Sequence, residues 1–541
     1  MSQRSMSANR LALAAPAALT AVLGAIGLSS RQLWQDELAT WWATALPGTD
    51  LTRLISQHDL TLAPYYALMH GWVTITGTSP VALRLPSLLA MVLAAALVTA
   101  LGRRLLGVTG GVAGGLLFAV IPAISRYAQE ARPYALVLAA AALSTLLLLR
   151  VLDRPTALRW ADYGFALAVT VSLHLVAALL LLAHAAWVWQ RRRGGRAPAA
   201  WLATTAIALV PGVALTLDSF DQREQVSWID TTWLSALMLL SDLTASIPVA
   251  IGLILLAALG TARGWREHRD TLFPLLIWAA APPLLLLAVS PLADLVVPRY
   301  LLFTLPAWAL LAASGVASLL LHTSLPVGTS PLPSPQHADA AGPLPTAESS
   351  AAAKPLPRFA AKRGHFAARS HALLQNVTGW RAGGLVLVVL VVLVVGLPGV
   401  VDQVGVRRDP SWAPDFRGAA VVIGERALPG DGLAYADASW RERLGTTYHL
   451  PATARWLPDP FAEVSAAERG DYAVAECPAP RTCLPDEIRR LWFVTTTIGG
   501  DPFAGLPSGK AAVLREEFTI ASTMEFTELR LLLLMRSTNP S

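Results

Sequence analysis

The chain has 541 residues, of which 54% are hydrophobic and only 14% are charged, whereas soluble proteins carry about a quarter charged residues. This balance excludes an ordinary soluble protein and places most of the chain in a membrane. The net charge of +6 does not indicate nucleic-acid binding, because the basic residues occupy short segments between apolar runs. No cleavable signal peptide is expected, since the first apolar run lacks a small-residue cleavage site and further spans follow it.

About eleven transmembrane helices are predicted, because a bilayer core is crossed by roughly 20 apolar residues and many windows satisfy that. A polar and aromatic loop, residues 29–79, follows the first span. The fifth and sixth spans run together, and a single long or re-entrant helix there would change the parity. The predicted spans are Leu11–Leu28, Val81–Leu101, Val108–Ser125, Pro133–Arg150, Trp160–Leu173, His174–Trp189, Ala199–Leu217, Trp233–Gly260, Leu272–Ser290, Leu301–Leu321 and Gly383–Val401.

The distribution of arginines supports this topology with the N-terminus in the cytoplasm, because basic residues are enriched in inner loops. Asp36, Glu37, Glu130 and Asp294 then fall on the outer side. The arginines of the inner loops are Arg103, Arg104, Arg150, Arg154, Arg159, Arg191, Arg192, Arg193, Arg196, Arg263, Arg266 and Arg269.

The predicted fold class is mainly α: a polytopic membrane protein with a small extracytoplasmic α/β domain at its C-terminal end. The expected parts are a transmembrane catalytic domain (1–321), a disordered cytoplasmic linker rich in Pro, Ala and Ser (322–382), a last transmembrane helix (383–401) and a soluble domain (402–541).

Short patterns within the soluble domain predict its local structure. The runs Ala419–Ile423 and Leu491–Thr496 are typical of buried strands, and Pro429–Gly432 is typical of a turn. Cys477 and Cys483 lie close enough in sequence to form a small disulfide loop outside the cytoplasm; the alternative is a pair of unpaired surface thiols.

Two adjacent carboxylates, Asp36 and Glu37, follow Trp34 directly after the first span. Glycosyl transfer needs a carboxylate that takes the proton from the acceptor hydroxyl, and partial desolvation near the membrane makes a carboxylate a better base. The two residues are therefore the catalytic candidates, with a solvated acidic loop as the alternative. They could also ligate a divalent metal, but no His/Cys cluster lies near them, so neither a metal site nor another cofactor is predicted.

Arginines on the outer side are the candidates for binding a phosphate. Arg126 and Arg132 are unexpected in an outer loop, and guanidinium groups match phosphate oxygens in bidentate geometry. The alternative for this loop is an internal ion pair with Glu130. Arg299, next to Tyr300, is a similar candidate, with an interfacial anchor as its alternative.

Arg84 lies in an apolar helix and needs a partner in space, for which Asp36, Glu37, Asp59 or a phosphate would serve. His58 and Asp59, with Tyr65 and Tyr66, are candidates for lining an acceptor site.

Two further polar residues, Asp242 and His174, lie within or at the end of predicted spans. For both, a structural role is the simpler interpretation.

Several segments in chain order resemble the GT-C superfamily of membrane glycosyltransferases: 34–40, 65–72, 82–90, 125–136 and 298–305. The nearest branch is similar to the protein O-mannosyltransferase and aminoarabinose-transferase group, in its actinobacterial mannosyltransferase-like form. The Asp-Glu pair, the LRLPS run and the RYAQEARPYAL run carry the resemblance in combination. The segment 58–64 departs from the Asp/His-then-Pro-Pro pattern of the group, which leaves the acceptor side open.

This resemblance implies an inverting transfer from a polyprenyl-phosphate sugar, often mannose, with Asp36 as the catalytic base. It implies that arginines such as Arg132 and Arg299 hold the lipid phosphate and that Glu130 shapes the site, with Tyr134 in the matching run and Tyr300 beside Arg299. The expected partners are the donor, membrane lipids and an acceptor glycan, lipid or protein, at the plasma membrane.

Two other functions fit the membrane topology. A polyprenyl-lipid flippase or transporter is disfavoured, because such proteins show inverted repeats and broken helices at the midplane, whereas the charged residues here gather at one interface. An inactive scaffold with the same fold is disfavoured by the intact Asp-Glu pair.

Overall fold

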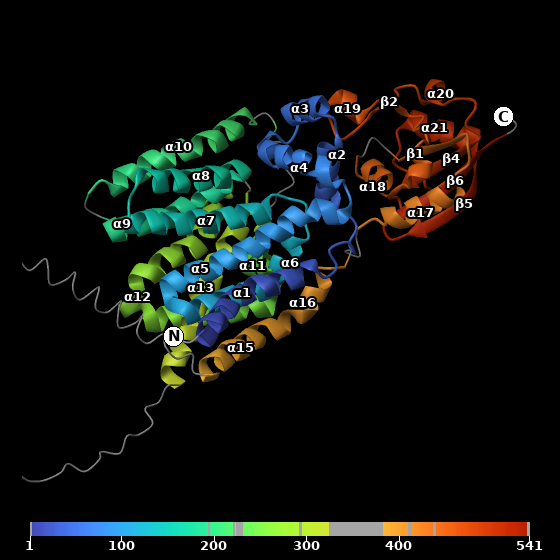
Figure 1. Cartoon of the computed structure of the whole chain (residues 1–541). Helices are drawn as coiled ribbons and strands as arrows, with labels where there is room; N and C mark the ends of the chain where they lie inside the picture. The colour runs from blue at the N-terminus through green and yellow to red at the C-terminus, as the bar shows by residue number, and fades with distance from the viewer. Residues whose placement is uncertain are drawn as a thin grey trace, which may run out of the picture.

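The computed structural model describes residues 3–192, 195–219, 222, 231–291, 295–323, 382–408, 413–436 and 440–537. The helices form one large bundle, and a small β-sheet region lies at one end of it, beside α2, α3 and α4 (Figure 1). The predicted linker falls almost entirely outside the described residues.

Six helices within the described ranges are long and apolar enough to span a membrane. This supports a multi-pass membrane protein. They are Pro80–Val120 (α5), Tyr134–Asp153 (α7), Ala197–Asp218 (α10), Ile247–Val289 (α12), Pro298–Leu320 (η4, Pro298–Thr304, leading into α13, Leu305–Thr323) and Gly384–Gly405 (α15, Ala382–Gly396; η6, Leu397–Gly399; α16, Val400–Gly405).

The remaining helices of the bundle do not meet both criteria over their described residues. They are α1 (Gln3–Ala25), α6 (Pro122–Ala128), α8 (Ala157–Leu173), η2 (Leu175–Leu180), α9 (Leu181–Arg192) and α11 (Trp233–Thr244).

Two of the long elements are bent, and each bend separates two predicted spans. In α5 the bend is at Gly107, whose φ of 82° is a conformation that glycine adopts without a steric penalty. The two halves fold back on each other and approach closely at Gly111. A Cβ on Gly111 would lie only 2.7 Å from the carbonyl oxygen of Thr99. In α12 the bend is at His268.

The predicted span Trp233–Gly260 is wrong as a single helix. Ala245 adopts a left-handed conformation with φ of 55°, which ends α11, and Ser246 then caps α12. The two predicted spans that run together are separated at His174, after which the chain continues as the 3-10 helix η2.

The prediction that residues 29–79 form a loop is also wrong, because most of this segment is helical. It contains α2 (Gln35–Ala45), α3 (Gly48–Gln57), η1 (Leu60–Leu62) and α4 (Ala63–Thr76). Its apolar residues are buried between these helices, with Leu38 of α2 and Met69 of α4 among them. The segment therefore packs as a helical cap on one end of the bundle (Figure 1).

The C-terminal region contains a four-stranded sheet in the order β1-β4-β6-β5, with β1 and β4 parallel and the other neighbours antiparallel. A separate two-stranded ribbon pairs β2 with β3. The strands are β1 (Asp431–Tyr435), β2 (Ala462–Val464), β3 (Ala475–Glu476), β4 (Arg490–Thr495), β5 (Phe518–Phe526) and β6 (Leu529–Arg536). The helices are α17 (Phe416–Arg426), α18 (Trp440–His449), η7 (Ala452–Ala454), α19 (Ala466–Arg469), α20 (Pro480–Cys483) and α21 (Ser508–Glu517).

The local predictions for this region have mixed outcomes. The strand predicted at Leu491–Thr496 is confirmed as β4, and the turn is confirmed at Gly430, whose φ is 91°. The strand predicted at Ala419–Ile423 is wrong, because Asp415 caps a helix there by accepting a hydrogen bond from the Gly418 amide at 2.9 Å.

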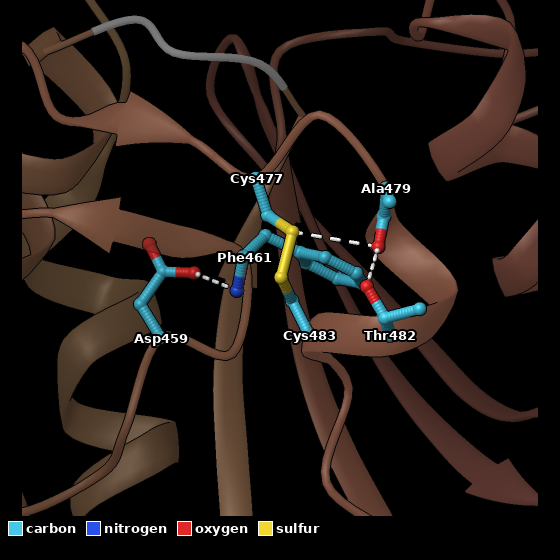
Figure 2. The surroundings of a disulfide bond; sticks show 6 residues. All are labelled: Asp459, Phe461, Cys477, Ala479, Thr482 and Cys483. Carbon is cyan, nitrogen blue, oxygen red and sulfur yellow. Dashed lines mark hydrogen bonds between the residues drawn. A yellow bond between two sulfur atoms is a disulfide. The ribbon is translucent and has the colours of Figure 1, made fainter.

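Cys477 and Cys483 are joined by a disulfide (Figure 2). The bridge closes the segment that runs from the end of β3 into α20. Of the two alternatives for these cysteines, the structure therefore shows the bridged one.

The end of the last membrane helix is hydrogen-bonded to the end of α1. The Arg407 side chain donates hydrogen bonds to the carbonyl oxygens of Leu23 at 2.6 Å and Ile26 at 3.1 Å. Arg31 in turn donates to the carbonyl oxygen of Val406 at 3.0 Å. The chain thus enters the C-terminal region from a point fixed against the end of α1.

Candidate active site

Asp36 lies on the first turn of α2, where a carboxylate is favoured by the exposed N–H groups and the helix dipole. Its Oδ2 atom is 3.8 Å from Arg132 Nε and 3.8 Å from Arg299 Nη2. These distances are too long for direct hydrogen bonds, and the side chain keeps 18% of its surface exposed. The carboxylate is therefore held between two cations while its oxygen atoms stay accessible.

Glu37, the neighbouring carboxylate, has a different environment. Both of its oxygens accept hydrogen bonds of 2.8 Å from the Arg84 guanidinium, and Oε1 also accepts one of 2.9 Å from the Ala131 amide. The side chains of Glu37 and Arg84 are 0% and 1% exposed. The structure thus selects Glu37 among the partners considered for Arg84.

Arg84 has no N–H left for a phosphate. An arginine has five N–H donors, and here two bind Glu37 while the others bind the carbonyl oxygens of Leu28, Arg31 and Gln32. These contacts favour a structural role for the pair, while the phosphate-binding role of Arg84 and the catalytic role of Glu37 stay predictions. The pair fixes the segment that leads from α1 to Asp36.

Glu130 lies in the short connection between α6 and α7 and is 2% exposed. Neither of its carboxylate oxygens has a hydrogen-bond partner among the described residues, so no hydrogen bond supports the internal Arg–Glu130 ion pair that was the alternative for this loop. Burial raises the pKa of Glu130 to about 7, and the Arg126 guanidinium opposes that rise. A carboxyl group with this pKa exchanges a proton near neutral pH.

Arg299 is the second residue of η4 and lies between Asp36 and a group of aromatic side chains. Its Nε donates a 3.1 Å hydrogen bond to the Tyr134 hydroxyl, and its guanidinium lies 5.7 Å from the Trp34 ring and 5.8 Å from the Tyr300 ring. His174 packs edge-on against Tyr300 at 4.7 Å. The predicted Tyr134 and Tyr300 are thus brought to Arg299, whereas Trp34 and His174 were not predicted as site residues.

A cavity of about 460 Å³ lies beside Arg299. Arg126 and Arg299 line it together, and the acids Asp242 and Asp402 line it as well. Two arginines in one polar cavity suit an anionic ligand, because guanidinium groups bind phosphate oxygens strongly. Asp402 comes from α16, far away in sequence, so no local pattern could have placed it here.

Buried polar atoms without hydrogen-bond partners gather around this site. Such atoms are uncommon in folded proteins, and a cluster of them indicates a place where a polar ligand or water binds. Within the described ranges they include Trp34 Nε1, Tyr65 OH, Ser125 Oγ, both carboxylate oxygens of Glu130, Arg132 Nε and His174 Nε2.

His58 and Asp59 lie where α3 and η1 meet the C-terminal region. Asp59 Oδ2 accepts hydrogen bonds from the hydroxyls of Tyr66 at 2.9 Å and Tyr472 at 2.6 Å. His58 Nε2 is 3.6 Å from Asp471 Oδ1. Tyr472 carried no sequence signal for this role, because its partner lies more than 400 positions away.

Comparison with known proteins gives likenesses in sequence and in fold. A family model described as dolichyl-phosphate-mannose-protein mannosyltransferase matches residues 63–216. Among curated proteins, no sequence gives a significant match.

Solved structures resemble the chain over nearly its whole length. ArnT from Cupriavidus metallidurans bound to undecaprenyl phosphate is 14% identical with a TM-score of 0.54, over 96% of this chain and 97% of that one. The same protein in its apo state is 15% identical with a TM-score of 0.53, over 95% and 96%. At these identities the likeness establishes the fold.

Proposed function

Since the chain has the GT-C glycosyltransferase fold, as its sequence resemblance predicted, we propose that it transfers a sugar from a polyprenyl-phosphate donor to an acceptor hydroxyl. The observation that carries this proposal is the position of Asp36. A partly exposed carboxylate lies 3.8 Å from each of two arginines, beside a cavity that one of them lines. This arrangement supports Asp36 as the base and the neighbouring arginines as the groups that bind the phosphate.

In the proposed reaction, an acceptor hydroxyl attacks the anomeric carbon of the donor sugar. The bond between that carbon and the phosphate oxygen breaks as the new glycosidic bond forms, which inverts the configuration. Asp36 takes the proton of the acceptor hydroxyl. The lipid phosphate leaves as an anion, and Arg299, Arg132 and Arg126 stabilise its charge.

Several features support a phosphate-linked lipid donor. The ArnT relative of the same fold was solved with undecaprenyl phosphate bound. The cavity beside Arg299 contains a second arginine, Arg126, and is bordered by membrane-spanning helices. Among sugars we propose mannose first, because the family model over 63–216 describes mannosyltransferases.

We propose that the reaction occurs on the outer face of the plasma membrane, where the acceptor is a glycan, a lipid or a protein. The arginine-rich loops on the opposite side support this orientation. The Cys477–Cys483 disulfide supports it independently, since disulfides persist in oxidising compartments.

The test is a transfer assay on the purified full-length protein. Radiolabelled polyprenyl-phosphate mannose is supplied with membrane extract as the acceptor source. We expect transfer by the wild type and a loss of at least about 100-fold in Asp36→Asn, which removes the base. Asp50→Asn is the matched control, because it changes a partly exposed carboxylate of the neighbouring helix α3 that pairs with Arg53 at 3.0 Å.

Near-normal transfer by Asp36→Asn would exclude Asp36 as the base. Absence of transfer by the wild type with mannose and with other polyprenyl-phosphate sugars would reject the enzymatic proposal and favour a lipid transporter or an inactive scaffold.

A further inference from the structure

The turn at Asp59 has a strained backbone. Its φ of 56° and ψ of 31° are left-handed, a conformation that residues other than glycine adopt infrequently, though aspartate tolerates it better than most. Such a conformation persists where the surroundings hold it. The Leu60 amide donates a 2.9 Å hydrogen bond to Gln222 Oε1, so the segment after α10 holds one side of the turn.

The C-terminal region holds the other side through Tyr472. Its hydroxyl donates the shorter of the two hydrogen bonds to Asp59 Oδ2, and it lies 3.2 Å from the Tyr66 hydroxyl. Tyr66 is fully buried, so these three polar groups depend on one another for hydrogen bonds. The turn, α4 and the C-terminal region thus meet at a single carboxylate.

Local contacts hold the backbone and the ring of Tyr472 in place. The neighbouring Asp471 accepts backbone hydrogen bonds from Tyr472 at 2.6 Å and Ala473 at 3.1 Å. The Tyr472 ring packs against Trp440 of α18 at 5.5 Å. A fixed hydroxyl on a fixed loop can impose a position on the groups that it contacts.

The cluster lies next to the candidate active site. Tyr65 precedes Tyr66 on α4, is buried, and has a hydroxyl without a hydrogen-bond partner among the described residues. Helix α4 is bonded to α2, the helix that carries Asp36, because His70 Nδ1 donates a 3.0 Å hydrogen bond to the Thr44 carbonyl oxygen. Because the Asp59 turn leads through η1 into α4, a shift of the turn would move α4 against α2 and Asp36.

We propose that Tyr472 is a positioning residue: through Asp59 and Tyr66, the C-terminal region sets the acceptor side of the site against Asp36. The inference rests on the proposed transfer reaction and gives the C-terminal region a part in it. Tyr472 touches neither Asp36 nor its arginines in the structure, so it acts through Asp59.

The experiment compares two variants of the full-length protein that each remove one hydroxyl from the same interface. Tyr472→Phe keeps the ring against Trp440 and loses the bond to Asp59. Tyr448→Phe, the control, loses a 3.1 Å hydrogen bond to the Thr78 carbonyl oxygen and keeps the ring against Trp41. We expect kcat to fall about ten-fold or more in Tyr472→Phe with the donor KM unchanged, and to stay within about two-fold in Tyr448→Phe.

Two further measurements distinguish a positioning role of Tyr472 from a role only in attaching the C-terminal region to the helices. Hydrogen exchange of residues 57–63 is expected to accelerate in Tyr472→Phe and to stay unchanged in Tyr448→Phe. In an Asp59→Gly background, which removes the carboxylate and relieves the left-handed strain, Tyr472→Phe is expected to have no additional effect.

Unchanged exchange in Tyr472→Phe, or an equal loss of transfer in both single variants, would overturn the proposal. If the wild type itself transfers no sugar, the proposed function fails, and the exchange measurement alone then decides whether Tyr472 holds the Asp59 turn.

Discussion

The buried pair of Arg84 and Glu37 gives a prediction about single residues. Arg84→Met leaves Glu37 buried without its counter-charge, which costs about 3–5 kcal/mol for a pair of this kind. We expect a large fall in the thermal unfolding temperature of the detergent-solubilised protein. The double variant Arg84→Met/Glu37→Gln removes the unpaired charge and is expected to recover part of that loss.

Arg126→Met is the matched comparison, since Arg126 lines the cavity and is a proposed phosphate ligand. It is expected to raise the donor KM and leave the unfolding temperature nearly unchanged. A stability loss as large as that of Arg84→Met would contradict this division between a structural and a ligand-binding arginine.

A second prediction concerns Glu130 and pH. Its pKa is raised to about 7 in the folded protein, so between about pH 4.5 and 7 the folded state keeps a proton that the unfolded state releases. The free energy of unfolding therefore falls as pH rises through this window, by at most about 3 kcal/mol. Glu130→Gln cannot titrate and is expected to gain unfolding temperature relative to the wild type at pH 8 but not at pH 4.5. A difference that is the same at both pH values would contradict the assignment.

The sequence predicted which residue types gather at the site, but not which of them pair. Arg84 was expected to need a partner, but Glu37 lies 47 positions away. Nothing in the sequence around either residue identifies the other as its partner. Asp36 and Glu37 are adjacent on a helix, so their side chains point in different directions. One faces the arginines of the site and the other faces Arg84, a distinction that requires the packing of α2. Asp294, predicted on the outer side, lies outside the described residues.

At the level of elements, α12 and α13 approach each other through glycines. A Cβ on Gly315 would lie 2.2 Å from the Leu256 carbonyl oxygen, and a Cβ on Gly260 would lie 2.4 Å from the Gly315 amide nitrogen. Small residues allow this close backbone approach, which is common between membrane helices. Because η4 leads directly into α13, the same contact supports the position of Arg299.

We therefore expect Gly315→Ala to push α13 away from α12 and to destabilise the protein by about 1–3 kcal/mol. Transfer should fall as well, since Arg299 moves with the helix. Gly384→Ala is the control, because its added methyl group would meet only the Leu320 side chain, at 3.8 Å. Thermal unfolding and transfer rates of the two variants give the comparison, and equal behaviour would rule out the glycine contact as a support.

Helices and strands were predicted most accurately where a single sequence signal, such as a long apolar run, was strong. Long apolar runs identified the membrane helices, but the segment Ala419–Ile423 was too short to distinguish a strand from a helix. Its helical pattern becomes visible only with Phe416 included, since Phe416, Ala419, Ala420 and Ile423 are buried together at helical spacing. The helices of residues 29–79 were missed because polar and aromatic residues interrupt their apolar faces.

At the scale of the whole molecule, the proposed orientation is tested with the two cysteines. Cys477→Ser leaves Cys483 as a single thiol, and a membrane-impermeant maleimide added to intact cells is expected to label it. A variant lacking both cysteines and carrying Thr156→Cys, in a predicted inner loop, should be labelled only after the cells are permeabilised. The reverse pattern would place the C-terminal region in the cytoplasm.

The contact between the C-terminal region and the helical part could not be predicted from the sequence. An α/β region after the last span was expected, but its contact with the first outer segment depends on pairs such as Asp59 with Tyr472 and Trp41 with Tyr448. Side chains several hundred positions apart show their partnership only once both parts are folded. The role proposed for Tyr472 therefore arises from the three-dimensional structure alone.

The hydrogen bonds between Arg407 and the end of α1 have a consequence for assembly. They connect the start of the chain to its final membrane helix without using the covalent path through residues 324–381. With Arg31 bound to Val406, they form a non-covalent connection between the end of α1 and the last membrane helix. A protein cleaved within 324–381 is therefore expected to keep its two fragments associated, and co-purification of the fragments in detergent checks this expectation.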